Sequence, residues 1–214
     1  MSRFYRYLVL MLVVFATTFA EAGSVEDDVR KIVIDSTSQL VEKLNQEKAT
    51  YSENPERFYS EMDLALSELV DFKRIAARVM GKSARVATKE QRSRFLKSFK
   101  QSLYVAYSKA LVESGAFEIA VEDVKVNPRS DKKASVNLVV TSASGNQYPV
   151  VYSMNYGKNQ VWMLENVIVN GVNVGLAFRD RFSQEMRQNQ GNIDDVIDGW
   201  TAQVEIKGED VATQ

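Results

Sequence analysis

The side chains that most often perform catalysis or hold metals are scarce in this sequence. Its 214 residues include no histidine and no cysteine, which excludes thiol chemistry, disulfides, the usual zinc and haem ligands and the commonest general base. Carboxylates such as Glu165 and Asp180 remain, together with lysines and serines that have no histidine partner. Because no nucleophile, base and orienting group form a recognisable set, the sequence predicts a protein that is not an enzyme.

Two acidic clusters and one glycine-containing segment do not indicate a cofactor either. Asp194 with Asp195, and the run from 26 to 28, lack the spacing of a metal-binding loop and stand where acidic residues favour the start of a helix. The segment from Gly171 to Gly175 has no phosphate-loop lysine. We therefore expect no metal and no cofactor.

The first 22 residues have the pattern of a secretory signal peptide. Two arginines precede an apolar run from 8 to 19, and residues 20–22 match the small-x-small cleavage pattern. An uncleaved membrane anchor is the alternative, and the shortness of the run argues against it. Without residues 1–22 the chain keeps 25 basic and 27 acidic side chains, a balance that argues against binding to nucleic acid or to anionic lipid by charge.

Helical periodicity occupies the chain before residue 115, with a polar linker expected at 47–54. Four helices are expected there: 24–48 opened by the Ser24–Asp27 pair, one beginning at Pro55, a short one capped by Asp71 and ending at Gly81, and a long one opened by the Thr88–Gln91 pair and ending near 114.

Beyond residue 115 the apolar period changes from 3.6 to 2. Short turns separate four expected strands at about 117–126, 133–141, 147–156 and 160–169, followed by helices at about 173–188 and 192–207 and a frayed tail at 209–214. The predicted fold is α+β: a curved four-stranded antiparallel sheet packed against a helical layer, enclosing an apolar cavity in a single domain from 23 to 208. Periodicity leaves open whether side chains fill that cavity.

The last predicted strand is apolar on both faces. Trp162, Leu164 and Ile168 alternate with a second apolar set, so the strand either buries both faces or lines something apolar with one of them. The strand before it places Tyr148 and Tyr152 on one face. The two strands together predict a wide aromatic and aliphatic wall.

Two long segments resemble a known family, and the likeness extends over essentially the whole chain after the signal peptide. The most specific matches are Phe72 with Ile75 and Gly81, the Gln91-Arg92-x-x-Phe95 segment running to Tyr107, and the segment from Trp162 through Gly171-Val172 to Arg179 and Phe182. In this order they resemble the MlaC family of periplasmic phospholipid-binding proteins, the toluene-tolerance proteins that assist ABC transport of lipids.

The resemblance implies a monomeric periplasmic carrier that holds one glycerophospholipid by its buried acyl chains. Such a carrier exchanges lipid between an inner-membrane ABC transporter complex and an outer-membrane lipoprotein complex, and so maintains the lipid asymmetry of the outer membrane. A periplasmic interaction module that carries nothing itself is the alternative, since the same sequence fits if side chains fill the cavity.

The wall residues are a hypothesis from strand alternation and helix periodicity. The proposed lipid-binding residues are Phe72, Ile75, Val79, Leu103, Tyr107, Tyr148, Val150, Tyr152, Met154, Trp162, Leu164, Ile168, Val172, Val174 and Phe178. Plain core packing is the alternative for each of them, because apolar residues are inside either way. Lys82, Arg85 and Arg179 are candidates for the headgroup rim or for docking, although a solvated surface charge is the commoner role.

Overall fold

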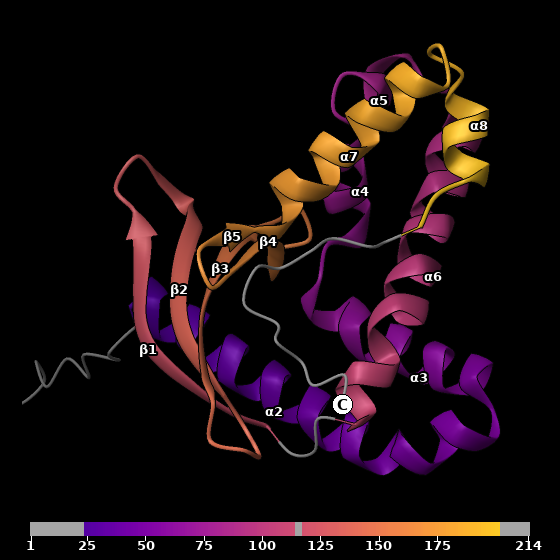
Figure 1. The fold of residues 1–214 in the computed structure, drawn as a ribbon. Coiled ribbons are helices and arrows are strands. Elements are labelled where there is room, and N and C mark those ends of the chain that lie inside the picture. The colour runs from indigo at the N-terminus through magenta and orange to yellow at the C-terminus, as the bar shows by residue number, and fades with distance from the viewer. Residues whose placement is uncertain (1–23, 114–116, 202–214) are drawn as a thin grey trace, which may run out of the picture.

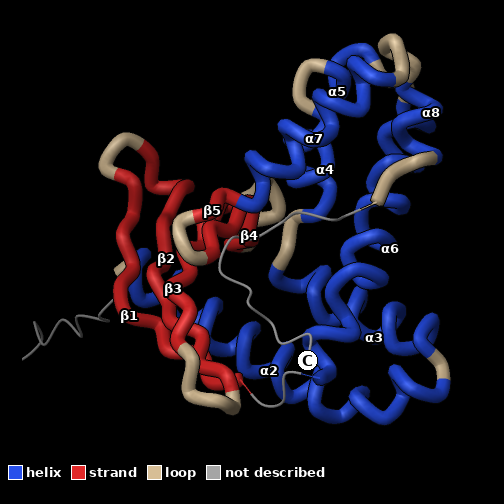
Figure 2. The backbone as a smooth tube through the Cα atoms, viewed as in Figure 1, coloured by secondary structure: helices blue, strands red, loops and turns tan. Residues whose placement is uncertain are grey.

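The computed structural model describes residues 24–113 and 117–201, in which helices pack against one antiparallel sheet that lies at one side of the molecule (Figures 1 and 2). The helices are α2 (Val25–Glu53), α3 (Pro55–Leu69), α4 (Phe72–Met80), α5 (Ser83–Val86), α6 (Lys89–Glu113), α7 (Val174–Gln188) and α8 (Ile193–Asp198). The strands are β1 (Phe117–Asn127), β2 (Ser130–Ser142), β3 (Gln147–Tyr156), β4 (Trp162–Val169) and β5 (Val172–Asn173). The α+β class is as predicted.

The signal peptide predicted at 1–22 and the tail predicted at 209–214 lie outside the described residues. Within the described part of the chain, no helix combines the length and the apolar character that crossing a bilayer requires.

The strands form one sheet in chain order, each antiparallel to the next. This confirms the predicted meander, but the predicted number of four strands is wrong. Asn170 and Gly171 have φ angles of 49° and 78°, which are typical of the tight Asn-Gly hairpin turn. The turn sends Val172 back to pair with Val169, so a short fifth strand forms before α7 begins.

The helix start signals behave as predicted. Ser24 and Asp27 form a capping box on α2, and Asp71 accepts the backbone N–H of Arg74 at the start of α4. The side chains of Thr88 and Gln91 bond reciprocally to each other's backbone N–H groups. Each pair satisfies donors that the first turn of a helix leaves free.

Two predicted boundaries are wrong. The linker at 47–54 is helical, because α2 continues to Glu53 and Tyr51 packs edge-on against Phe58 of α3 at 5.3 Å between ring centroids. Asn54 then both ends α2 and caps α3. The last helix stops at Asp198 and is followed by Gly199, well before the predicted residue 207, and residues beyond 201 are outside the described part.

A β-bulge in β4 decides which side chains share a face. Met154 pairs with Leu164, but the preceding β3 residue, Ser153, pairs with Asn166, so Glu165 is an extra residue. An extra residue reverses the alternation of side chains beyond it. The inner face of the β3–β4 pair, which faces the helical core, therefore consists of Val150, Tyr152, Met154, Tyr156, Trp162, Leu164, Val167 and Val169.

The bulge also moves Ile168 to the opposite, outer face. Ile168 pairs with Val151, which lies between the inner-face residues Val150 and Tyr152 and therefore points to the outer face. Strict alternation predicted that Ile168 would share a face with Trp162 and Leu164. That grouping is wrong, because a single inserted residue shifts the period by one.

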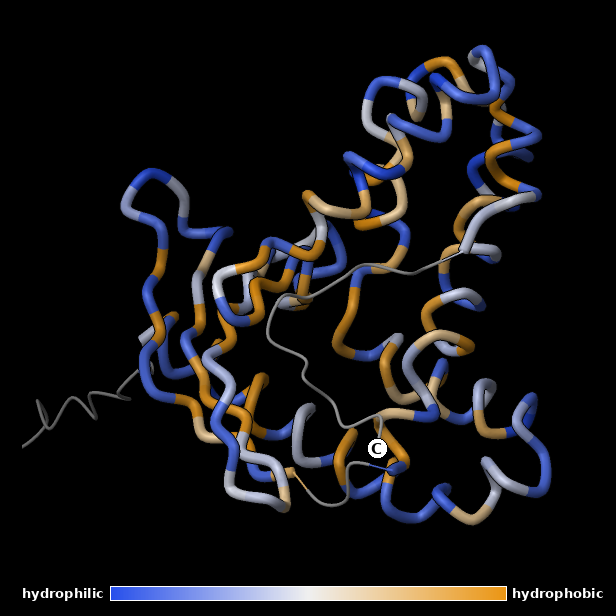
Figure 3. The backbone as a smooth tube through the Cα atoms, in the orientation of Figure 1, coloured by the Kyte–Doolittle hydropathy of each residue, from blue (hydrophilic) through white to orange (hydrophobic). Residues whose placement is uncertain are grey.

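The main core lies between the inner face and the helices. Helix α2 packs along β1 and β2 (Figure 1), and its Val29 and Val33 are completely buried in one cluster with Val136. Hydrophobic and hydrophilic residues alternate along these strands (Figure 3). At the β4 end the cluster continues into the layer of α4, α6 and α7, where Phe99 meets Phe178 and Trp200 at centroid distances of 5.4 and 6.3 Å.

Candidate functional site

The inner face of the sheet is a continuous apolar surface. Strands β1 to β4 all contribute to it, and the register shifts in β1 and β4 move the alternation by one residue without interrupting the apolar face. The outer face of the same strands is more polar, with Ser135 and Ser153 opposite each other and Asn137 opposite Val151. The two faces therefore differ in chemistry, and an apolar ligand would be favoured only on the inner one. The inner-face residues of β2 are Ala134, Val136, Leu138 and Val140.

Coverage of the inner face is incomplete. Val136 and Met154 are 0% and 1% exposed, whereas Tyr152, Val167 and Val169 are only partly buried against the core. Burial nevertheless raises the pKa of the Tyr152 hydroxyl to about 12. That hydroxyl makes no hydrogen bond to any residue in the described part of the chain. A tyrosine that is enclosed in this way needs a partner for its O–H, from water or from a ligand.

The predicted wall residues fall into three groups in the structure. Seven are buried in the main core, namely Phe72, Val79, Val150, Met154, Trp162, Leu164 and Phe178. Five are partly buried against that core, namely Ile75, Leu103, Tyr107, Tyr152 and Val174. Three lie outside the cluster, namely Tyr148, Ile168 and Val172.

Some members of the buried group are packed inside the core and expose almost no surface that a ligand could contact. Phe178 is 2% exposed and its ring lies edge-on to Phe99 and tilted against Trp200. Val79 is 0% exposed. In the β3–β4 pair, the inner-face side chains that keep accessible surface are instead Tyr152, Tyr156, Val167 and Val169. The two valines were missed because strict alternation assigned them to the other face.

Glu165, the bulge residue, is the centre of a cluster of cations. Its carboxylate is 6% exposed and lies 2.6 Å from Arg74, 2.9 Å from Arg78 and 2.7 Å from Lys133. Burial by itself would raise the pKa of Glu165, but hydrogen bonds from Lys133 and Arg78 and their positive charge outweigh burial and hold that pKa below its usual range. The three ion pairs join α4 to β2 and β4.

A cleft of about 700 Å³ opens beside this cluster, between α4, α5, α7 and the β3–β4 pair. Lys82, Arg85 and Arg179 all line it, together with Arg78. Arg78, Lys82 and Arg85 are close in the sequence, whereas Arg179 is distant, and only the packing of α4 against α7 brings it to the others. The sequence analysis named Lys82, Arg85 and Arg179 as separate candidates, but the sequence contains no signal that they share one cleft.

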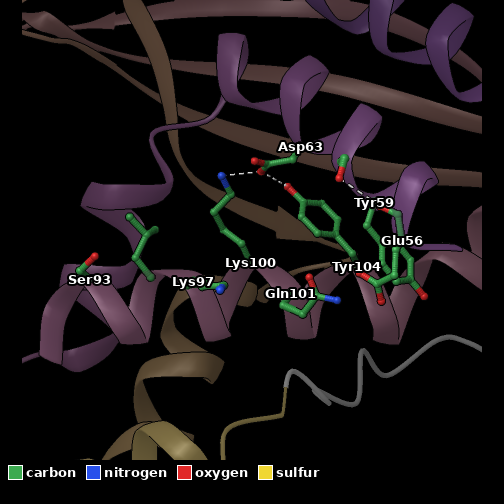
Figure 4. Close-up of a pocket in the computed structure, with 10 residues that line it drawn as sticks. Glu56, Tyr59, Asp63, Ser93, Lys97, Lys100, Gln101 and Tyr104 are labelled. Carbon is green, nitrogen blue, oxygen red and sulfur yellow. Dashed lines mark hydrogen bonds and ion pairs between the residues drawn. The ribbon is translucent and has the colours of Figure 1, made fainter. Parts of the chain in front are cut away.

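A second pocket, of about 320 Å³, lies between α3 and α6 and contains a hydrogen-bonded tyrosine, Tyr104 (Figure 4). Tyr104 donates its hydroxyl to Asp63 at 2.6 Å, and Lys100 pairs with the same carboxylate. Burial and then the hydrogen bond to Asp63 raise the pKa of Tyr104 far above neutrality. The hydroxyl therefore holds its proton at neutral pH and fixes α6 to α3.

Nothing in the described residues points to catalysis or to a metal centre. Within 24–113 and 117–201, no group of three or more carboxylates is placed to hold a metal ion. The features that remain are an open antiparallel sheet, an apolar inner face and a basic cleft, which together define an α+β protein with surfaces suited to binding.

Comparison with known proteins agrees with that class. A phospholipid-binding protein of Ralstonia solanacearum, solved in complex with a phospholipid, superposes with a TM-score of 0.70 over 78% of this chain and 90% of that one. The two sequences are 17% identical, so this likeness shows the shared fold.

The sequence itself identifies the family. The profile of the MlaC protein matches residues 35–202. The toluene tolerance protein ttg2D of Pseudomonas putida is 37% identical over 201 residues, which cover 93% of this chain and 90% of the relative. The chain therefore belongs to the MlaC family, as the sequence motifs implied.

Proposed function

We propose that this protein is a periplasmic carrier that binds one glycerophospholipid and shuttles it between an inner-membrane ABC transporter complex and an outer-membrane lipoprotein complex. In this proposal residues 1–22 are the cleaved signal peptide and 23–208 form a single lipid-binding domain. Family membership, the toluene-tolerance relative and the phospholipid bound to the Ralstonia protein all support it.

The observation that carries the proposal is the incompletely covered apolar inner face. Tyr152, Tyr156, Val167 and Val169 keep accessible surface on the β3–β4 part of this face, whose other side chains are buried in the core. Well-packed interiors leave few such surfaces, because a gap beside an apolar side chain forfeits its contacts. Acyl chains laid against this face would restore those contacts, and the lone Tyr152 hydroxyl would reach a polar group of the lipid or water.

The energetics of the cargo require an apolar surface of this kind. At about 0.8 kcal/mol per buried methylene, two acyl chains with roughly thirty methylenes oppose transfer into water by about 25 kcal/mol. A soluble carrier must offset nearly all of this by burying both chains. In the proposal the inner face and the helices opposite it provide that burial, while the headgroup stays near the surface.

Lipid analysis of the natively expressed protein tests the proposal. The full chain is expressed with its own N-terminal segment, purified from the periplasm without detergent, and extracted with chloroform and methanol. We expect about one diacyl phospholipid per chain by phosphorus assay and mass spectrometry. A well-folded protein that contains no lipid and takes none up from vesicles would contradict the proposal and would favour the non-carrying interaction module.

A further inference from the structure

We propose that the basic cleft formed by Lys82, Arg85 and Arg179 is the docking site for an acidic, protruding segment of a protein partner. The inference rests on the proposed function, because the partners in question are the two membrane complexes between which the carrier would move. It adds to the proposed function the surface of the carrier that contacts a partner and the charge of the partner segment that this surface would recognise.

The first observation is unpaired positive charge. Lys82, Arg85 and Arg179 are exposed, and within the described residues none has a carboxylate within 4.0 Å. Among the residues that the structure describes, Glu165 is the only acidic one that lines the cleft, and it already pairs with Arg74, Arg78 and Lys133. The cluster is therefore an excess of cations on a protein whose overall formal charge is −1. An acidic partner is its electrostatic complement.

The second observation is that the cations are held around a concave surface. Lys82 is the N-cap residue of α5, Arg85 lies within α5, and Arg179 faces them from α7. The Arg179 Nε lies 3.4 Å from the position that a Cβ on Gly81 would occupy, and Gly81 has a φ of +57°. Glycine at this position therefore both ends α4 and lets the arginine lie across its end. The cations thus sit on elements fixed by the α4–α7 packing.

The third observation is exposed apolar surface beside the charges. Leu176 lines the cleft and is 50% exposed, and Val86, next to Arg85, is 83% exposed. Protein interfaces combine a desolvated apolar centre with charged groups at the rim that steer association. A hollow of about 700 Å³ accepts a protruding protein segment, whereas a bilayer surface is flat and would contact the rim alone. The shape therefore favours a protein over a membrane.

On its sheet side the cleft is also separate from the surface proposed for acyl chains, whereas on its α4 side Ile75 and Val79 line it and belong to or pack against the main core. Ser153 and Asn166, which line it, lie on the outer face of the sheet. The lipid would occupy the inner face. A partner in the cleft could therefore bind while the lipid is still in place, as transfer within a docked complex requires.

Charge reversal with a matched control tests the inference. The test variant is Lys82→Glu/Arg85→Glu/Arg179→Glu. The control is Arg129→Glu/Lys132→Glu/Lys158→Glu, which changes the net charge equally at exposed residues in or beside the strand turns, none with a carboxylate partner in the described part of the chain. If the reversal variant does not fold, the corresponding glutamine variant replaces it, since it removes the charges without adding repulsion.

The readout is binding of the full chain, at several salt concentrations, to the two proposed partners from the same organism. These are the inner-membrane ABC transporter complex and the outer-membrane lipoprotein complex, each purified in nanodiscs. We expect at least one complex to bind the wild type with an affinity that falls as salt rises, the test variant to bind it about tenfold more weakly or worse, and the control to stay within about twofold. A photo-crosslinker at Leu176 should attach to a segment rich in aspartate or glutamate.

Several results would overturn the inference. One is unchanged binding of the test variant, or no binding of the wild type to either complex. Another is loss of bound phospholipid in the test variant alone, which would make the cleft a headgroup site. A third is unchanged binding to the complexes together with lost binding to phosphatidylglycerol vesicles, which would assign the cleft to the membrane surface. Absence of lipid from the wild type would instead contradict the proposed function and is read separately.

Discussion

Glutamate at position 167 should abolish phospholipid binding, whereas glutamate at position 168 should not. Val167 lies on the inner face opposite Tyr152, and Ile168 lies on the outer face opposite Val151. Both are β-branched, both are partly buried and they are neighbours in β4, so the substitutions have similar intrinsic effects on the strand. Any difference in lipid binding therefore reports which face the acyl chains contact.

The expected loss can be worked from the protonation of the new carboxyl group. If acyl chains cover residue 167, the glutamate is either ionised and desolvated, which costs several kcal/mol, or protonated. Protonation at pH 7 costs about 4 kcal/mol, because pH 7 is about 2.7 units above the usual glutamate pKa and each unit is about 1.36 kcal/mol. The cheaper route thus weakens lipid binding by roughly three orders of magnitude. Without lipid, a partly exposed glutamate reaches water and the fold survives.

The same arithmetic predicts a pH dependence. At pH 5 the cost of protonation falls to about 1 kcal/mol, so Val167→Glu should recover much of its lipid binding there, and wild type should change little. The assay is uptake of a fluorescent phospholipid from vesicles at pH 7 and pH 5, with thermal unfolding as the control for folding. Equal lipid binding by Val167→Glu and Ile168→Glu at pH 7 would refute the assignment of the inner face.

Three further substitutions test the packing that supports this face. Glu165→Gln should lower the free energy of unfolding at pH 7 by about 1–3 kcal/mol, a discounted value because the three cations are about 40% exposed. The pKa of Glu165 is lowered in the folded state, so the stabilisation by its carboxylate is present above pH ~4.3 and is lost as the pH falls below that range. The difference in urea stability between wild type and Glu165→Gln should therefore be smaller at pH 3 than at pH 7. A difference that does not depend on pH would contradict this. Tyr104→Phe removes the hydrogen bond to Asp63 and should cost about 1 kcal/mol, and unchanged urea stability would mean that the bond contributes nothing. Phe99→Ala empties a site that is 1% exposed and faces Trp200 and should cost about 3–5 kcal/mol, so a loss below 1 kcal/mol in the same assay would show that the cluster is loosely packed.

Local signals predicted most of the architecture. Helix caps such as Ser24, Asp71 and Thr88 act within a few residues, and the alternation of apolar and polar residues can be read from the sequence of each strand by itself. The meander followed because short turns leave antiparallel neighbours no other arrangement. The boundary at Glu53 was missed because a polar segment can be helical when a residue such as Tyr51 packs on a neighbouring helix.

The site was harder to predict because it depends on register and on tertiary packing. The extra residue of the bulge, Glu165, forms ion pairs with residues of α4 and β2. These partners lie in other elements, so the sequence of β4 alone does not indicate the bulge. The bulge exchanges Ile168 for Val167 on the inner face. The basic cleft likewise exists only because α4 packs against α7. Which residues are apolar was predictable, whereas which of them share a surface was not.

Photo-crosslinking from the acyl chains tests the central claim most directly. The natively folded full chain is loaded with a phospholipid that carries a diazirine near the end of one acyl chain, irradiated, digested and mapped by mass spectrometry. We predict labels on inner-face residues such as Tyr152, Val167 and Val169, and their loss when unlabelled phospholipid competes. Labels confined to Val151 and Ile168 on the outer face, or labelling that competitor lipid does not reduce, would contradict the account.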